Sequence, residues 1–172
     1  MIETLIFGFV LAASYIITGS AFGAVLPAAL AAGGLALAAA VAALRKNGPL
    51  AKQLGVKAAV FLLVSGGVYG VNWLSSKKAR SGAEQLAAVC ETYKEKTGAY
   101  PGAFRDLVPG YIEDIPAARV TAMWAQYRLV GTKIMYVLEP GLLAAAYDLS
   151  EKKWGVVSFS EMFPKKTETA AK

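Results

Sequence analysis

The sequence contains no histidine and only one cysteine, Cys90, among its 172 residues. Without histidine the chain lacks the commonest general base and a common metal ligand. A single cysteine excludes an intrachain disulfide and a structural zinc site made of several thiolates. We therefore predict no catalytic, cofactor-binding or metal site, and a protein that is not an enzyme. Cys90 falls on the apolar face of a predicted helix, where we expect a small buried residue rather than a reactive thiol.

Carboxylates are few, and those that lie close together fall in predicted turns. Glu113 is followed by Asp114, and Asp148 lies near Glu151. Adjacent carboxylates in turns are usually solvated, which is the interpretation we favour. Calcium binding is the alternative, and it requires oxygen ligands from several further loop positions.

Charge is scarce and unevenly placed. Only 17% of the residues are charged, against about 25% in an ordinary globular chain. No charged side chain lies between Glu3 and Arg45, a stretch about long enough for two bilayer crossings of roughly 20 residues each. We predict a helical hairpin here, with spans from about Thr4 to Ile17 and from about Phe22 to Leu44. Because Glu3 lies where a signal peptide is normally positive, a cleaved signal peptide is the less favoured alternative for the first span.

A further apolar run, Ala58–Leu74, continues without a proline into an amphipathic segment. Apolar residues then recur at three- and four-residue steps, the period of a helix with one buried face: Ala83, Leu86, Val89, Cys90 and Tyr93. Gly98 is a natural left-handed stop for such a helix. The pattern predicts a third membrane helix that continues, up to about Thr97, as the first helix of a water-soluble domain.

The remainder of the chain has the pattern of a small antiparallel sheet. A helical turn at residues 103–108 and a short extended piece at Tyr111–Ile112 come first. Four strand-like segments follow, at residues 125–130, 133–138, 145–149 and 154–159, with turns at Gly131-Thr132 and Ser150–Lys153 between the paired segments. We expect the helix ending near Thr97 to cover the apolar face of this sheet, and the polar tail at residues 164–172 to be frayed.

These elements predict an α+β membrane protein with three transmembrane helices, the third continuing into a helix packed on a small antiparallel sheet. The predicted regions are a transmembrane hairpin with a basic cytoplasmic loop at residues 1–57, the long helix at 58–97, and an extracytoplasmic sheet domain with a polar tail at 98–172.

Three short segments between the long helix and the sheet resemble a known family. They are Tyr93–Pro101 (YKEKTGAYP), Leu107–Ile112 (LVPGYI) and Ile115–Pro116. In this order, after a hydrophobic helix and before antiparallel strands, they resemble the type IV pilins and the pseudopilins of type II secretion.

The resemblance covers about residues 58–159, so it implies a pilin-like fold for the carboxy-terminal half. It implies that Tyr100 and Pro101 open the loop from helix to sheet and that the segment containing Pro109 and Pro116 ends that loop. It also implies a domain on the extracytoplasmic side of a bacterial inner membrane.

The chain departs from that family at the membrane helix. Prepilins carry a glycine before a phenylalanine at their cleavage site, and a glutamate five residues into the mature helix. Here Val56-Lys57-Ala58 precedes the helix, and residues 58–74 contain no acid. We therefore predict a pilin-like domain that is held permanently in the membrane and is not released to polymerise.

Basic residues beside the spans bear on orientation. The segment between the second and third spans contains four basic residues and no acid, and three more basic residues follow the third span: Arg45, Lys46, Lys52 and Lys57, then Lys77, Lys78 and Arg80. The positive-inside rule narrowly places the first group in the cytoplasm, together with the amino terminus, and the resemblance decides the same way. Although the net charge is +6, we expect anionic membrane lipid as its partner and no nucleic acid.

Small and polar residues inside the spans indicate helix packing. Gly19 and Gly23, and Gly66 and Gly70, are each four residues apart, the spacing that lets helix backbones approach in lipid. We favour packing within the chain's own bundle, with an oligomer interface as the alternative. Asn72 is expected to bond across helices. We assign the aromatic residues Trp124, Tyr127, Tyr136, Tyr147 and Trp154 to strands, as sheet core and cross-strand pairs.

Two functions are compatible with these features. The first is a non-enzymatic integral membrane component that presents its domain to other membrane or envelope proteins, in a secretion-type, pilus-type or other membrane complex. The alternative is a small transporter or channel subunit. It is disfavoured because the predicted spans contain no ionisable residue of the kind that normally marks an ion path.

Overall fold

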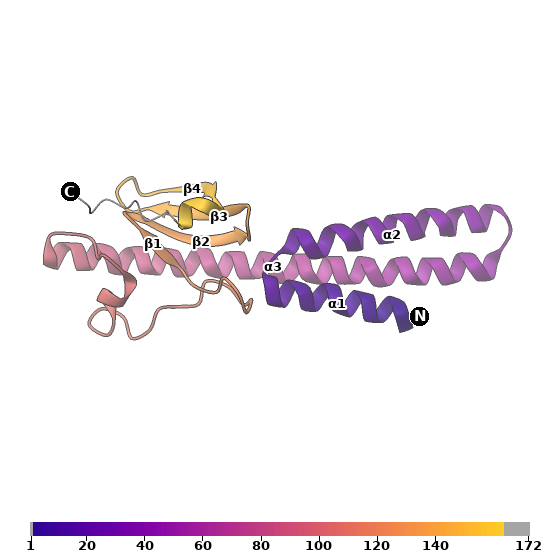
Figure 1. Cartoon of the computed structure of the whole chain (residues 1–172), viewed down its shortest axis with the longest axis horizontal. Helices are drawn as coiled ribbons and strands as arrows, with labels where there is room; N and C mark the ends of the chain where they lie inside the picture. Colours follow the sequence, from indigo (N-terminus) through magenta and orange to yellow (C-terminus); the bar gives the residue numbers. More distant parts are fainter. Residues whose placement is uncertain (1, 164–172) are drawn as a thin grey trace, which may run out of the picture. The chain divides into compact units, whose positions relative to one another are not determined.

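The computed structural model describes residues 2–163. The helices are α1 (Ile2–Thr18), α2 (Ala21–Leu44) and α3 (Gly48–Thr97); the strands are β1 (Arg128–Val130), β2 (Lys133–Glu139), β3 (Leu143–Asp148) and β4 (Lys153–Ser158); and the short 3-10 helices are η1 (Phe104–Leu107) and η2 (Phe159–Met162) (Figure 1). The chain divides into two units. Among the described residues, the first unit holds residues 2–75 together with Thr121–Met123, and the second holds Ser76–Val120 and residues 124–163.

In the first unit, caps and left-handed residues set the end of α1, both ends of α2 and the start of α3. After α1, Gly19 adopts a left-handed conformation with φ of +75°. The hydroxyl of Ser20 then caps α2 by accepting the N–H of Gly23 at 2.9 Å. At the other end of α2, Lys46 takes a positive φ of 59°, and Asn47 Oδ1 accepts the N–H of Leu50 at 3.2 Å to cap α3.

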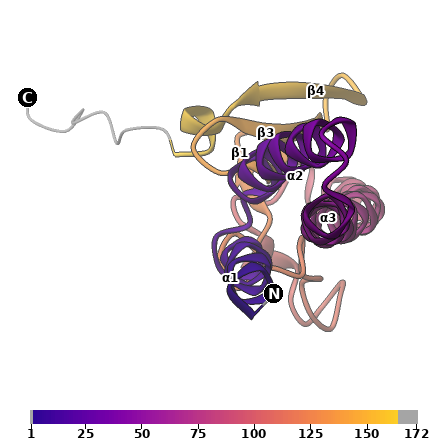
Figure 2. The same ribbon diagram turned by 90° about the vertical axis from the view of Figure 1, so that its right-hand side faces the viewer.

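The first unit is held together by small clusters of apolar side chains. Leu11 of α1 packs with Ala28 of α2 and Phe61 of α3, and Tyr15 packs with Ala24 and Val68 in the next layer. Seen end-on, the three helices occupy the corners of a triangle (Figure 2). The alanines allow this approach because helices in lipid pack through close backbone contact rather than through the hydrophobic effect.

The prediction of three transmembrane helices is wrong, because only two described helices are long and apolar enough to cross a membrane. These are α2, with 24 residues, and α3. With 17 residues α1 is about 26 Å long at about 1.5 Å per residue, which is shorter than the roughly 30 Å of a bilayer's hydrocarbon core. The predicted cytoplasmic amino terminus depended on that additional crossing and is withdrawn with it.

The basic connection between the second and third predicted spans is also shorter than expected. Because α3 begins at Gly48, only residues 45–47 lie outside the two helices. The start is encoded locally: Asn47 is a strong helix cap, and Pro49 is tolerated in the first turn, where an N–H has no helical partner. The apolar run at residues 58–74 is therefore the middle of α3 rather than its beginning.

In the second unit, the predicted four-stranded antiparallel sheet is confirmed, with strand order β1-β2-β3-β4. The turn at Gly131 has a φ of +60°, as a tight hairpin requires. Strand β1 begins at Arg128, three residues later than predicted, because Trp124 takes a φ of +63° and the chain bends there. Tyr111 and Ile112 form no strand, since both N–H groups bond to the carbonyl of Leu107.

The core of the second unit lies on both faces of the sheet. On one face, the predicted helix cover is confirmed: Leu86 and Cys90 of α3 are fully buried with Ile134 and Tyr136 of β2. The other face contains a second cluster, in which η2 supplies one residue: Met135, Val137, Ala144, Ala146 and, from η2, Met162. The predicted frayed tail at residues 164–172 lies outside the described residues.

Candidate membrane-embedded and protein-binding surfaces

The outer surfaces of α2 and α3 in the first unit are apolar and exposed. Only 17% of the most apolar stretch of each helix is buried, whereas the core helix of a soluble protein is mostly buried. Among the exposed side chains, Leu37 of α2 has 69% of its surface accessible and Leu63 of α3 has 76%. A soluble monomer rarely exposes so large an apolar patch. Two helices of this chain are therefore suited to membrane association.

A hydrogen bond joins α1 to α3 inside the first unit. The hydroxyl of Tyr15 donates to Asn72 Oδ1 at 3.3 Å, and Tyr15 is only 2% exposed. The prediction that Asn72 bonds across helices is confirmed. In lipid the bond matters because no water is present to satisfy either group.

The two glycine pairs lie in different surroundings. Gly19 follows α1 and Gly23 lies in the first turn of α2, so this pair belongs to the connection between two helices. A β-carbon on Gly19 would lie 3.3 Å from Thr121 Oγ1. Gly66 and Gly70 lie on one helix, and a β-carbon on either would meet no atom within 4 Å. The structure thus places no side chain of the described residues against Gly66 or Gly70. Packing within the chain's own bundle, which we favoured, and an oligomer interface, the alternative, both stay predictions.

Sequence reasoning missed the segment that caps the carboxyl end of α1. The N–H of Ala122 donates to the carbonyl of Ile16 at 2.9 Å, and that of Met123 donates to Ile17 at 3.3 Å. The last carbonyls of a helix have no partner within the helix, and leaving them unsatisfied in an apolar environment is costly. The capping groups are backbone N–H groups about a hundred residues further along the chain, so no local sequence pattern predicts them.

The predicted loop motif holds the second unit together. The hydroxyl of Tyr100 lies 2.9 Å from Glu91 Oε1 and 3.1 Å from the carbonyl oxygen of Leu149, two acceptors that share its one proton. The Lys94 ammonium lies 4.2 Å from the centre of the Tyr100 ring. Tyr100 thereby connects the last turns of α3 to the turn between β3 and β4.

The prolines of the motif occupy distinct places along the same loop. Pro101 is buried directly after Tyr100, Pro109 follows η1 after a cis peptide bond, and Pro116 is half-buried just before the segment that leads to β1.

A buried arginine in this loop also escaped prediction. Arg119 is 4% exposed, and its Nη1 donates to the carbonyls of Val137 at 3.0 Å and Leu138 at 2.7 Å. The pairing of β2 with β3 shifts register between Val137 and Glu139, so Arg119 bonds to the strand where the ladder is irregular. The available signal was a single charged residue within an apolar stretch, residues 115–123.

The neighbouring carboxylates lie in a turn or on the surface, and the Cys90 thiol lies in the core. Asp148 Oδ1 accepts the hydroxyl and the N–H of Ser150 at 2.6 and 2.9 Å, which holds the turn after β3, while Glu113 and Asp114 are exposed. No group of three or more possible metal-ligating side chains occurs within residues 2–163. Burial raises the pKa of the fully buried Cys90 thiol to about 11, with a smaller contribution from Glu91, so the interpretation of Cys90 as a core residue is confirmed.

Aromatic side chains pair across the sheet, as expected for Tyr136, Tyr147 and Trp154. The Trp154 ring centre lies 5.2 Å from that of Tyr147, its direct partner in register, and 6.2 Å from that of Tyr136. Tyr127 and Trp124 precede β1 and are not in strands, contrary to expectation. Tyr127 still joins the core through its ring contact with Tyr136 and a 2.7 Å bond to the carbonyl of Ala79.

Of the two edge strands of the sheet, β1 and β4, β4 is the clearer candidate for a protein contact. Among the described residues, β4 pairs with β3 on one side only. Val156 at its centre is 64% exposed, and Leu142 and Leu143 at the start of β3 are 58% and 46% exposed. Lys153 at the start of β4 is charged, but the rest of the strand, Trp154–Ser158, contains neither charge nor proline, the devices that usually protect an edge strand from pairing.

Comparison with protein-family models, with curated proteins and with solved structures returned no match for this chain, so the resemblance to pilins and pseudopilins stays a prediction.

Proposed function

We propose that this protein is a non-enzymatic component of a bacterial inner membrane that presents its sheet to another envelope protein outside the cytoplasm. The main support for the proposal is that the two parts of α3 have different surroundings. Its first part exposes apolar side chains such as Leu62 and Leu63, and its second part buries Leu86 and Cys90 under the sheet. One helix thus serves both as a membrane segment and as the core of a folded unit.

Charge supports the orientation of this anchor. With two crossings, the connection between α2 and α3 lies on one side of the membrane and the sheet on the other. Arg45 and Lys46 are exposed in this connection, and Lys52 is exposed near the start of α3. Because no acid occurs among residues 45–57, the positive-inside rule favours the cytoplasm for the connection. Lys77 and Lys78 act against this orientation, and the resemblance to pseudopilins favours it.

The contact itself is assigned to β4. An uncovered strand edge offers a row of backbone donors and acceptors that an extended segment of a partner can pair with, and exposed side chains such as Val156 select the partner. A partner bound in this way adds a strand to the sheet through backbone hydrogen bonds and needs no reactive side chain. This agrees with the structural roles of Asp148, which holds a turn, and of Cys90, which lies in the core.

Crosslinking in native membranes tests the proposal. A photoreactive phenylalanine analogue in place of Val156 should yield a covalent adduct with one envelope protein, joined through a single segment of that partner. The same analogue in place of Glu113, an exposed loop residue of the same unit, is the matched control and should yield none. No adduct from position 156, or the same adduct from both positions, would sink the proposal.

A further inference from the structure

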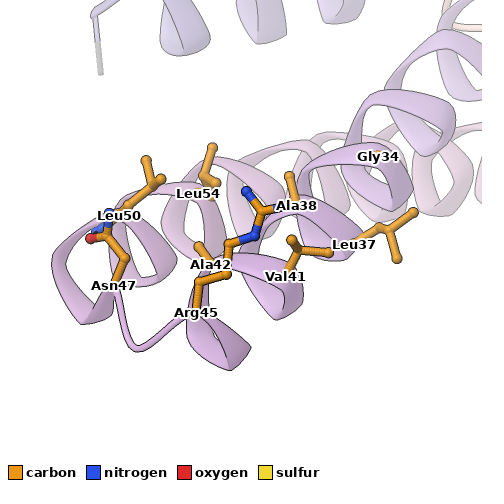
Figure 3. Close-up of a pocket in the computed structure, with 9 residues that line it drawn as sticks. All are labelled: Gly34, Leu37, Ala38, Val41, Ala42, Arg45, Asn47, Leu50 and Leu54. Atoms are coloured by element: carbon orange, nitrogen blue, oxygen red, sulfur yellow. The ribbon is translucent and has the colours of Figure 1, made fainter.

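A groove lies where α2 and α3 join, within the first unit (Figure 3). Its volume is about 550 Å³, within the roughly 300–1,000 Å³ of small-molecule sites. Leu37 and Val41 of α2 line one wall, and Leu50 and Leu54 of α3 line the other. Aliphatic walls of this kind suit a hydrocarbon chain.

One cationic side chain completes the groove. Arg45 follows the last residue of α2, and Figure 3 shows its side chain running back along the helix toward Ala38, so the guanidinium lies at the groove and does not point away from it. Neighbouring Lys46 and Lys52 are exposed but do not line the groove, and no acid occurs among residues 45–57. A guanidinium presents a planar fork of donors that matches phosphate oxygens.

We propose that this groove binds one anionic phospholipid, with its phosphate on Arg45 and an acyl chain along Leu37, Val41 and Leu54. The inference rests on the proposed function, because it requires α2 and α3 to lie in a bilayer. It goes further in naming a single site and its ligand class. The guanidinium and the aliphatic walls together favour an anionic phospholipid over the alternatives. A free phosphate leaves the aliphatic walls uncovered, and a zwitterionic lipid brings a second cation to a surface that is already cationic.

The full chain in neutral detergent, studied by native mass spectrometry, tests the site. Dioleoyl phosphatidylglycerol is titrated against the wild-type chain, Arg45→Ala and Lys46→Ala. The two variants lose the same charge from adjacent positions, but only Arg45 lines the groove. We expect retention of the first lipid to fall about tenfold in Arg45→Ala, the loss typical of one charge-assisted hydrogen-bonded pair, and less than about twofold in Lys46→Ala. Ala38→Trp, which fills the groove and keeps every charge, should also abolish retention.

Two further arms identify the source of the phosphate. Dioleoyl phosphatidylcholine should be retained at least about tenfold more weakly than phosphatidylglycerol, and glycerol 3-phosphate should not compete. Equal losses in Arg45→Ala and Lys46→Ala would overturn the proposal, since they would show only diffuse attraction to a basic surface. Equal retention of phosphatidylcholine, or competition by glycerol 3-phosphate, would overturn it as well. The result is separable from the crosslinking test at Val156, because a lost protein partner leaves lipid retention unchanged.

Discussion

At the scale of single residues, a few buried polar contacts fasten the second unit. Tyr127 bonds to the carbonyl of Ala79, Tyr100 bonds to Leu149, and Arg119 bonds to Val137 and Leu138. Each joins residues far apart in the sequence. A buried polar group that loses its partner keeps its desolvation cost, so these positions should be more sensitive to substitution than the exposed surface.

Gly82 is required by one of these contacts. A β-carbon there would collide with the hydroxyl of Tyr127. Gly82→Ala should lower the free energy of unfolding by about 1–3 kcal/mol, the usual cost of overpacking, and Tyr127→Phe in the same chain should reduce that cost by removing the colliding oxygen. Denaturant unfolding followed by tryptophan fluorescence measures both. The control is Gly155→Ala, whose β-carbon meets no atom within 4 Å; equal costs at 82 and 155 would contradict the packing described.

Cys90 should be chemically silent in the folded protein. Its pKa of about 11, raised from 9.0, lowers the thiolate fraction at pH 8 about a hundredfold, and burial adds a steric barrier. A thiol-specific chromogenic reagent should therefore react at least about a hundredfold faster in denaturant than in the native protein. Equal rates in the two states would show that the α3–sheet contact is open.

Asp148 should make the turn after β3 sensitive to acid. Hydrogen bonds, above all from the Ser150 hydroxyl, lower the pKa of this carboxyl below its ordinary value of 3.8. A depressed pKa means that the carboxylate adds stability above pH 3.8, and that this stability is lost as the pH falls through the folded-state pKa. Asp148→Asn should thus be less stable than wild type at pH 6, and the difference should shrink toward pH 2. A difference that does not change with pH would refute the assignment.

At the scale of elements, α1 is held in the first unit by its side chains and by its carboxyl end. Leu11 and Tyr15 pack on α2 and α3, and Ala122 and Met123 cap its last carbonyls. The helix therefore has a defined place although it is too short to count as a crossing.

The Tyr15–Asn72 bond should couple α1 to α3 measurably. Replacing Tyr15 by Phe and Asn72 by Leu, singly and together, should give a coupling free energy of about 0.6 kcal/mol and no more than about 1.7 kcal/mol, the range found between membrane helices. Unfolding in mixed micelles measures it. Tyr69→Phe serves as the control because Tyr69 is 65% exposed; coupling of that variant to Asn72→Leu as strong as that of Tyr15→Phe would contradict the contact.

Sequence patterns predicted which helices and strands form better than where they begin and end. The three- and four-residue spacing of Ala83, Leu86 and Cys90 identified the buried face of α3, and Gly98, with a φ of +84°, ends that helix as expected. The number of crossings was wrong because the apolar stretch Thr4–Ile17 was counted as a span, although even the full 17-residue α1 is shorter than the roughly 20 residues of a crossing. The cap at Ala122 and the bonds of Arg119 depend on tertiary folding, which local patterns do not carry.

At the scale of the whole molecule, the proposed function requires α2 and α3 to cross the membrane and the sheet to lie on the side away from the cytoplasm. Membrane insertion accounts for the exposed leucines of α2 and α3, and the β4 edge around Val156 is the surface that the anchored protein would offer to a partner. The crosslinking test assumes opposite sides for the α2–α3 connection and the sheet, whereas the lipid test in detergent does not depend on sidedness.

Labelling of single cysteines in intact cells tests that arrangement most directly. Glu113→Cys lies in an exposed loop of the second unit, Lys46→Cys lies in the α2–α3 connection, and native Cys90 is buried and adds no background. A maleimide that cannot cross the inner membrane should label Glu113→Cys in intact cells, and Lys46→Cys only after that membrane is permeabilised. Labelling of Lys46→Cys in intact cells, with Glu113→Cys protected until permeabilisation, would contradict the account.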